Sequence, residues 1–389
     1  GQNVYSLQLS YDVRGNISSK TETVSGTATT FDYTYDQDGQ LVQVKKQGAI
    51  AENFAYDVNG NRTSYERPGQ WTVTAGYDEQ DRILQQGSVS YQFNADGQLA
   101  QRGSDAFLYS ATGELLQSTA NGDTIVYSYD GTGRRIARTD VSGTKQYLYS
   151  NLEQPFQLTA MRDTAGVLSY YYYDTNGHLF AFDKGDERFY VASDQLGTPK
   201  VVTDTTGTVV RQMEYDSYGM PTFDSNPAFE MPVGFAGGIS DAKTGLVRFG
   251  YRDYEPETGR WTAKDPILFK GNQGNLYGYV SNDPINWIDP DGLQKWKVTN
   301  PEQHPGGQRH VHWGDDAKAR NGGAVNEDGS TRHGCKPPRK VVDKIRALTG
   351  WALEDLGAMA PFFVLPGQQQ MLDNLNNGMP IDHYPGKIY

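Results

Sequence analysis

The chain has 389 residues, a formal net charge of -12 and a single cysteine, Cys335. Its length exceeds the roughly 100 to 200 residues of an ordinary domain, which predicts two or more folded units. One cysteine excludes an internal disulfide framework, and no apolar stretch reaches the roughly 18 residues that a membrane-spanning helix needs. The 26 tyrosines and 44 glycines instead indicate short strands joined by glycine-rich turns.

Charge and histidine are unevenly distributed along the chain. Residues 294–389 contain 12 Lys/Arg and 10 Asp/Glu side chains, and five of the six histidines. Residues 1–293 therefore have a balance of -14, and all of the excess negative charge lies there. This asymmetry predicts that the last 96 residues form a separate unit with a different function.

From the N-terminus onwards, a Tyr-Asp pair followed by a glycine four residues after the tyrosine recurs mostly every 16 to 24 residues. The glycine can adopt positive φ and the aspartate can bond the backbone amides just ahead of it, so each copy predicts a tight turn between two strands. The copies are Tyr11-Asp12 with Gly15, Tyr35-Asp36 with Gly39, Tyr56-Asp57 with Gly60, Tyr129-Asp130 with Gly133, Tyr173-Asp174 with Gly177 and Tyr215-Asp216 with Gly219. Weaker copies are Tyr77-Asp78, which lacks the glycine, and Phe93 with Gly97 and Tyr109 with Gly113, which lack the aspartate.

The segments between these turns alternate apolar and polar residues, as in Asp123–Tyr129 and Thr208–Tyr215. Such hairpins can bury their apolar face only by stacking edge to edge into a continuous sheet. The Tyr-Asp-x-x-Gly units resemble the YD repeats of the Rhs family of polymorphic toxins, which is related to Tc-toxin C components and teneurins. The resemblance covers about residues 5–293 and implies a mainly β chain whose hairpin sheet spirals into a hollow shell. A generic β-solenoid or sandwich with a tyrosine-rich core is the alternative.

From Arg248 onwards the sequence changes character. Its distinctive pieces are, in order, Arg248–Arg252, Gly259–Trp261, Asp265-Pro266, Asn275–Tyr277 and Asp289–Leu293. Their order and spacing resemble the Rhs-associated core motif, which in relatives cuts its own chain directly after the final leucine. This chain departs from the family after the first Asp-Pro, where Ile267-Leu268-Phe269 replaces the frequent Ile-Gly-Leu.

The resemblance implies an aspartyl-protease-like site for self-cleavage that needs no cofactor. Asp265 and Asp289 match the acidic pair, Arg252 the group that positions them or stabilises charge, and Leu293-Gln294 the scissile bond. Two carboxyl groups that share one site cannot both ionise, so one can act as an acid while the other activates water. In the alternative interpretation each Asp-Pro is only a turn that ends a strand, and Asp283 is a less favoured third candidate.

The last 96 residues carry a candidate nuclease site rich in histidine and basic side chains. His310 and His312 face one side of a predicted strand. With His333 and Arg332 they fit metal-free RNA cleavage, in which one histidine takes a proton and another returns one. A divalent metal bound by the first two histidines and Asp315, or its neighbour Asp316, is a second possibility. An ADP-ribosyltransferase or a deaminase is a third, although no Cys-x-x-Cys pair exists for a deaminase zinc site. A solvated basic face with structural histidines is the simplest alternative.

These observations predict three parts: a YD-repeat β-shell over residues 1–247, an Rhs-associated core over 248–293, and a small α+β effector over 294–389 with a basic helix at 337–348. The resemblance implies a secreted toxin carrier that encloses its own effector and is delivered into a target cell, as in interbacterial competition by type VI secretion. Implied partners are a cognate immunity protein, nucleic acid as substrate, and secretion machinery or upstream domains, because the chain opens within a repeat. A teneurin-like extracellular adhesion module with a non-enzymatic tail is the alternative function.

Overall fold

The structure is a computed structural model that describes residues 4–67, 69–120, 122–271, 274–299, 310–313 and 323–326. The chain divides into two units, Gly1–Leu353 and Glu354–Tyr389, and all described residues belong to the first. The helix expected at 337–348, the candidate metal ligands Asp315 and Asp316, and the candidate residues Arg332 and His333 lie outside the described residues.

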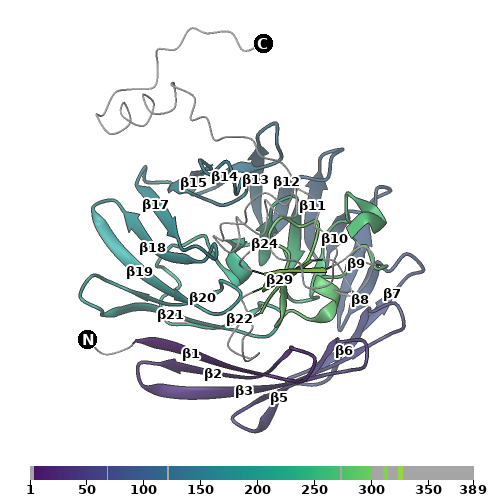
Figure 1. Cartoon of the computed structure of the whole chain (residues 1–389). Coiled ribbons are helices and arrows are strands. Elements are labelled where there is room, and N and C mark those ends of the chain that lie inside the picture. The colour runs from purple at the N-terminus through teal and green to yellow at the C-terminus, as the bar shows by residue number, and fades with distance from the viewer. Residues whose placement is uncertain are drawn as a thin grey trace, which may run out of the picture. The chain divides into compact units, whose positions relative to one another are not determined.

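Most of the described chain is one antiparallel sheet in which each strand pairs with the next along the sequence (Figure 1). This arrangement is the mainly β hairpin sheet that the repeats predict. The strands are β1 (Tyr5–Tyr11), β2 (Ile17–Val24), β3 (Thr27–Tyr35), β4 (Leu41–Lys46), β5 (Ala49–Tyr56), β6 (Arg62–Glu66), β7 (Val73–Tyr77), β8 (Ile83–Gln86), β9 (Val89–Phe93), β10 (Leu99–Arg102), β11 (Asp105–Tyr109), β12 (Leu115–Ala120), β13 (Asp123–Tyr129), β14 (Arg135–Asp140), β15 (Gly143–Leu148), β16 (Ala160–Arg162), β17 (Leu168–Tyr173), β18 (Leu179–Lys184), β19 (Glu187–Ser193), β20 (Pro199–Thr203), β21 (Val209–Tyr215) and β22 (Pro221–Asp224).

The predicted turns form as their residues dictate. Asp130 Oδ1 accepts hydrogen bonds from the amides of Thr132 and Arg134 at 2.9 and 3.1 Å, and Gly133 has a φ of +82°. The weaker copies use substitutes, because Asn94 and Ser110 accept the same two amide bonds and Asp81 takes the glycine's place with a φ of +61°. The turn geometry therefore depends on a short polar side chain at its first position more than on aspartate itself.

Three further copies of this turn escaped the sequence analysis. Asp163, Asp194 and Asp204 each accept amide hydrogen bonds from the residues two and four positions ahead, and each is followed by a glycine with positive φ. None of them follows a tyrosine. The Asp-x-x-Gly spacing alone is thus the more complete signal for the turn.

The tyrosine in most of the pairs has a separate function, which is to tie neighbouring strands together at the turn. The hydroxyl of Tyr35 donates to the carbonyl of Ile17 at 2.8 Å, and that of Tyr56 donates to the carbonyl of Leu41 at 2.7 Å. A register shift directly before each tyrosine, as at Thr34/Tyr35, accompanies this contact. The hydroxyl thus gives a hydrogen-bond donor to a backbone carbonyl of a buried residue.

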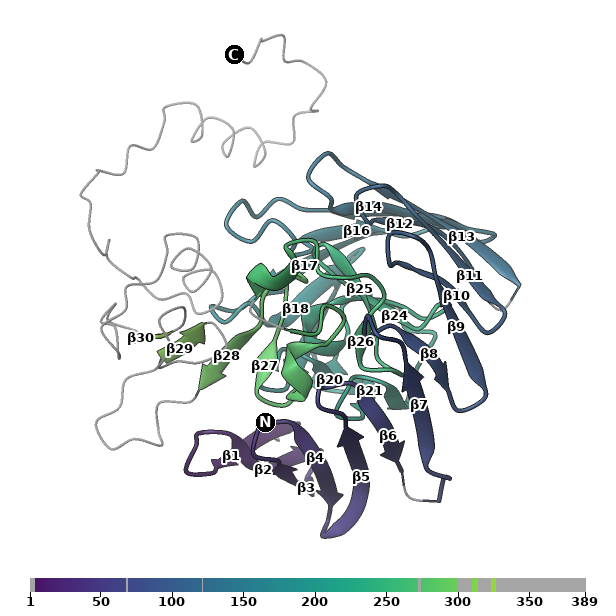
Figure 2. The same cartoon turned by 90° about the vertical axis from the view of Figure 1, so that its right-hand side faces the viewer.

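Residues 229–293, named here the core segment, lie on the concave side of the curved sheet (Figures 1 and 2). Their rings pack in an apolar cluster with centroid separations of 4.4 to 6.1 Å, formed by Phe235, Phe249, Tyr254, Trp261 and Tyr279. The elements are η1 (Phe235–Gly237), β23 (Ile239–Asp241), β24 (Leu246–Phe249), β25 (Arg252–Glu255), β26 (Arg260–Trp261), η2 (Leu268–Gly271), η3 (Val280–Asn282) and β27 (Trp287–Ile288).

Buried polar contacts fasten the core segment to the repeats. Asp253 lies 2.8 Å from both Arg135 of β14 and Arg248 of β24, and Asp241 lies 2.7 Å from Arg138. Charges removed from water at these positions are tolerated because each has an opposite charge in hydrogen-bonding contact. The repeats thereby hold the core segment in a fixed position.

Strands β23–β26 form a second sheet, and a third sheet contains the strands on either side of the predicted cleavage position. β27 pairs with β28 (Trp296–Thr299), which pairs with β29 (His310–Trp313), which pairs with β30 (Gly323–Asn326). The predicted boundary between residues 247 and 248 falls inside β24. No helix in the described ranges is both long and apolar enough to cross a bilayer.

Candidate functional site

Arg252, the first residue of β25, brings the predicted acidic pair together. Its Nη2 atom lies 3.1 Å from Asp265 Oδ2 and 3.3 Å from Asp289 Oδ2. The guanidinium is 4% exposed and lies 4.1 Å from the ring centre of Trp261, while its Nε donates to the carbonyl of Gly292. The three residues that the sequence assigned to self-cleavage thus meet at one nitrogen atom.

Asp289 also contacts the predicted scissile bond directly. Its Oδ1 atom accepts hydrogen bonds from the backbone amides of Leu293 and Gln294, both at 2.9 Å. The second amide belongs to the Leu293-Gln294 peptide bond itself. The Asp289 side chain thus bonds Arg252 through one oxygen and this amide through the other, within proton-transfer reach of the nitrogen of the predicted scissile bond.

Two glycines of the distinctive sequence pieces allow this close approach, a role that the sequence did not reveal. Gly250 has a φ of +41°, and a Cβ there would lie 2.3 Å from the carbonyl oxygen of Asp291. Gly292 has a φ of +67°, and a Cβ there would lie 2.7 Å from the carbonyl oxygen of Phe249. The amide of Tyr251 donates to the same Asp291 carbonyl at 2.9 Å. The turn at residues 249–252 therefore lies directly against the backbone immediately before the predicted scissile bond.

Burial shapes the electrostatics of the site. Burial raises the pKa of Asp265, and the positive charge of Arg252 opposes the shift. Burial also lowers the pKa of Arg252, against the attraction of Asp289 and Asp265. One cation balances only one carboxylate, so a site from which water is excluded favours a proton on one of the two acids. The raised pKa makes Asp265 easier to protonate than an ordinary aspartate.

Asp283, the third candidate, lies at a different place and has a different set of contacts. It accepts hydrogen bonds from the Asn286 side chain at 2.8 Å and from its amide at 3.2 Å. Asn286 in turn accepts the amide of Ile17 at 2.7 Å. Burial raises the pKa of Asp283 to about 6 although the bonds from Asn286 oppose the shift. These contacts attach the core segment to the first repeat and do not include the acidic pair.

The departure from the family sequence after Pro266 is visible beside the acidic pair. Leu268 has a φ of +52°, a conformation that glycine adopts without strain. Its amide donates to the carbonyl of Asp265 at 3.0 Å, and the amide of Ile267 donates to Asp265 Oδ1 at 2.9 Å. The loop therefore keeps Asp265 in place even though leucine stands where glycine is frequent.

Of the candidate nuclease residues, the structure describes only the strand that holds two of them. His310 and His312 lie in β29, opposite Asn326 and Ala324 of β30. Within the described residues, no group of three or more histidine, cysteine or acidic side chains is arranged to hold a metal ion. The metal-free and metal-dependent nuclease hypotheses therefore both stay predictions.

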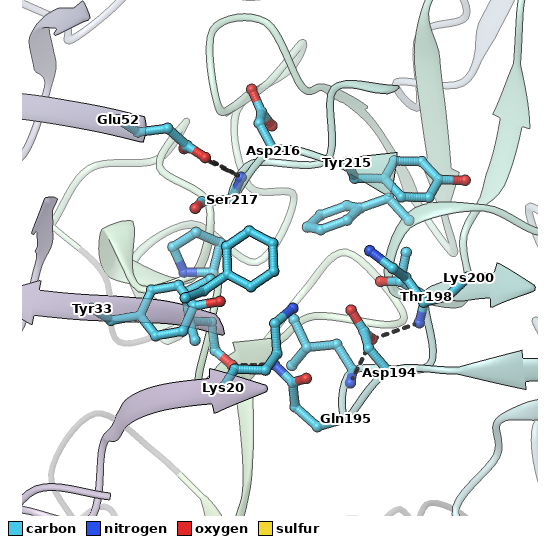
Figure 3. A pocket seen from close by; sticks show the side chains of 15 residues that line it. Lys20, Tyr33, Glu52, Asp194, Gln195, Thr198, Lys200, Tyr215, Asp216 and Ser217 are labelled. Carbon is cyan, nitrogen blue, oxygen red and sulfur yellow. Dashed lines mark hydrogen bonds between the residues drawn. The ribbon is translucent and has the colours of Figure 1, made fainter. Parts of the chain in front are cut away.

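A second cluster of ionisable residues joins the first repeats to the last ones (Figure 3). Both carboxylate oxygens of Glu52 in β5 lie 3.3 Å from the amide of Ser217, and Asp216 pairs with Arg67. A cavity of about 40 Å³ lies among these side chains. Burial, followed by the negative charge of Asp216, raises the pKa of Glu52 to about 8. We name this cluster the seam, because β5 and the turn after β21 meet there through side chains.

Comparison with known proteins agrees with the repeat architecture. The sequence model of the Teneurin YD-shell matches residues 1–285. Teneurin-3 of Danio rerio is 37% identical over 303 residues, and Teneurin-m of Drosophila melanogaster is 32% identical over 307 residues. These alignments cover 73% and 75% of this chain but 11% of either relative. The chain thus spans about a ninth of the length of these relatives.

Solved structures share the fold at lower sequence identity. The TcdB2-TccC3-Cdc42 crystal structure matches 75% of this chain and 17% of its own, with a TM-score of 0.61 and 20% identity. The structure of TcdB2-TccC3 without its hypervariable C-terminal region matches to the same extent. The fold and site define a YD-repeat shell protein related to teneurins and Tc toxins. By its sequence, the chain belongs to the teneurin YD-shell family, as its repeats predicted.

Proposed function

We propose that the chain cleaves itself after Leu293, with Asp265 and Asp289 as the catalytic acids. The observation that carries this proposal is the pair of contacts of Asp289, one to the amide of Gln294 at 2.9 Å and one to the shared Arg252 at 3.3 Å. A turn that merely ended a strand would not require a second buried carboxyl group at the same guanidinium.

In the proposed chemistry, Asp265 starts as the neutral acid and Asp289 as the ionised one. Ionised Asp289 takes a proton from a water molecule, whose oxygen forms a bond to the carbonyl carbon of Leu293. Neutral Asp265 donates its proton to the oxygen of that carbonyl, so that no full negative charge develops there. Asp289 then passes its proton to the nitrogen of Gln294, the C–N bond breaks, and Asp265 recovers its proton as the Leu293 carboxyl group forms. Arg252 maintains one positive charge beside the pair throughout.

Replacement of either acid tests the proposal. In a denaturing gel, the wild type should give two pieces, residues 1–293 and 294–389, whereas Asp265→Asn and Asp289→Asn should each give one band of 43.2 kDa. Asp130→Asn is the matched control, because Asp130 accepts the same kind of amide bonds in an exposed turn, and it should cleave normally. Two pieces from both acid variants would refute the assignment.

We propose further that residues 294–389 are an effector, a nuclease with RNA as the favoured substrate, which the shell carries to a target cell. Its positive balance, its histidines and the hypervariable C-terminal region named for a structural relative support this assignment. The proposed partners are a cognate immunity protein and a secretion system. Expression of residues 294–389 alone should arrest growth, and His310→Ala or His333→Ala should relieve the arrest. Degraded total RNA in arrested cells would identify the substrate class, and harmless expression would contradict the proposal.

Similarity to teneurins supports a second candidate function, an extracellular interaction module with a passive tail. At 37% identity to Teneurin-3, the repeats are as compatible with this function as with a toxin carrier. The two candidates differ at the acidic pair, since an interaction module has no need for a broken chain. If the wild-type chain stays uncut in the gel and expression of residues 294–389 does not arrest growth, the extracellular interaction module is favoured.

A further inference from the structure

We infer that the fold contains a binding site for the segment that follows the cut, so that cleavage by itself does not release the effector. This inference rests on the proposed cleavage after Leu293. The site, named here the anchor, holds Lys295, Trp296 and Lys297, which are 5%, 2% and 8% exposed. Three consecutive buried residues directly after a scissile bond are unexpected if the new chain end is meant to leave freely.

The anchor draws on separate parts of the core segment. Trp296 pairs in register with Ile288, and Lys297 with Trp287, in the antiparallel ladder of β27 and β28. The ammonium groups of both lysines lie over the Trp287 ring, at 5.0 and 5.7 Å from its centre. Both lysines therefore make cation–π contacts with the Trp287 ring, in addition to the backbone pairing between β27 and β28.

Hydrogen bonds extend the anchor to the first repeat. Lys295 Nζ donates to the hydroxyl of Ser281 in η3 at 2.5 Å, and Lys297 Nζ donates to the side chain of Asn16 in the first repeat turn. Burial lowers the pKa of Lys297, and the negative charge of Asp283 opposes the shift. None of these contacts involves the bond between Leu293 and Gln294, so all of them persist when that bond is broken.

Cleavage adds a further contact. Before the cut, Gln294 presents a neutral amide to Asp289 Oδ1 at 2.9 Å. After the cut, the same nitrogen is a terminal amine, whose ordinary pKa of about 7.7 to 8.0 leaves it largely protonated at neutral pH. A charge-assisted hydrogen bond to a carboxylate is stronger than a neutral one. The reaction thereby strengthens the hold on its own product, and release requires a separate step that opens the first repeat or β27.

Substitutions on both sides of the anchor test this inference. The wild-type chain, cut according to a denaturing gel, should elute as one species in native size-exclusion chromatography. Trp296→Ala should still be cut but should release the 294–389 fragment about 100-fold faster, because a deeply buried tryptophan is lost. Asn16→Ala and Ser281→Ala change only the shell side and should accelerate release to a smaller extent. Lys270→Ala, at an exposed lysine, is the control and should behave as the wild type.

The outcomes separate this inference from the proposed cleavage. If all three anchor variants are cut and retain the fragment as firmly as the wild type, enclosure alone holds the fragment and the anchor is refuted. If the wild type is not cut, the proposed cleavage fails, and hydrogen exchange of the uncut chain decides on the anchor. The anchor is supported if the amides of residues 295–299 exchange slowly in the wild type and faster in Asn16→Ala. Fast exchange of these amides in the wild type would refute it.

Discussion

Asp130 of a repeat turn and Asp289 of the core segment both bind backbone amides, but they lie in different surroundings. Asp130 and Asp289 each accept two backbone amides through Oδ1. Asp130 is partly exposed and bonds Arg134 of its own turn. Although its slight burial acts in the other direction, bonds from Thr132 and Arg134 lower its pKa to about 2. Asp289 is 1% exposed and shares Arg252 with Asp265, whose pKa is raised. An aspartate that binds backbone amides thus has its own cation in the repeat turn, whereas the two buried acids of the proposed cleavage site share one.

Because both acids share Arg252, its substitution should have the largest effect on the cleavage rate. Arg252→Lys retains the charge but cannot reach both carboxylates and the Gly292 carbonyl at once, because lysine lacks the planar fork. We expect cleavage to slow by about 100-fold or more. The measurement is the time course of the two bands after refolding of the denatured chain. Arg134→Lys, in an exposed turn, should leave that time course unchanged, and an equal slowing there would show that arginine loss acts through folding.

The second-largest difference should come from alanine substitutions of one glycine in the core segment and one in a repeat turn. Gly292→Ala places a Cβ 2.7 Å from a backbone oxygen at a φ of +67°, whereas Gly15→Ala at +76° meets nothing within 4 Å. We expect the first change to cost roughly 2 to 5 kcal/mol and to stop cleavage, and the second to cost about 1 to 2 kcal/mol from backbone strain alone. Chemical denaturation and the gel assay measure both effects. Equal stability losses with normal cleavage would contradict the close approach.

The contrast also explains what the sequence could predict. The repeats were predictable because Tyr35, Asp36 and Gly39 interact within one turn and with the adjacent strand, so their chemistry is local. The copies at Asp163, Asp194 and Asp204 were not predicted because no aromatic residue precedes their aspartates. That aromatic residue does not make the turn.

The candidate site was predictable only through its resemblance to a family motif. No local rule places Asp265 and Asp289 on one nitrogen of Arg252, because 13 and 37 residues separate them from it along the chain. The seam was missed for the same reason, since Glu52 and Ser217 are 165 residues apart. Contacts of this kind depend on the curvature of the whole sheet, which brings its first and last strands together, and no short stretch of sequence encodes that curvature.

The seam offers a buried acid outside the reactive pair, and its titration should affect stability but not cleavage. The Glu52 pKa rises from 4.5 to about 8 on folding. Folding therefore favours the protonated form, and the stability that it contributes is complete below pH 4.5 and is lost as the pH rises to about 8. Glu52→Gln should remove this decline, on the order of 3 kcal/mol between pH 5 and 9. Parallel declines of wild type and variant in denaturation at several pH values would disprove the shift.

Two neighbouring tyrosines provide the smallest and most local test. The hydroxyl of Tyr173 donates to the carbonyl of Leu158 at 2.7 Å at a repeat turn, whereas the hydroxyl of Tyr172 bonds Asp183 on an exposed surface. Tyr173→Phe should cost about 1 kcal/mol, because it leaves a carbonyl without its donor, and Tyr172→Phe should change stability by less than about 0.5 kcal/mol. Urea denaturation compares the two. If the losses are equal, the recurrent tyrosine stabilises the repeat through the burial of its ring, and the hydroxyl that ties the strands together contributes nothing measurable.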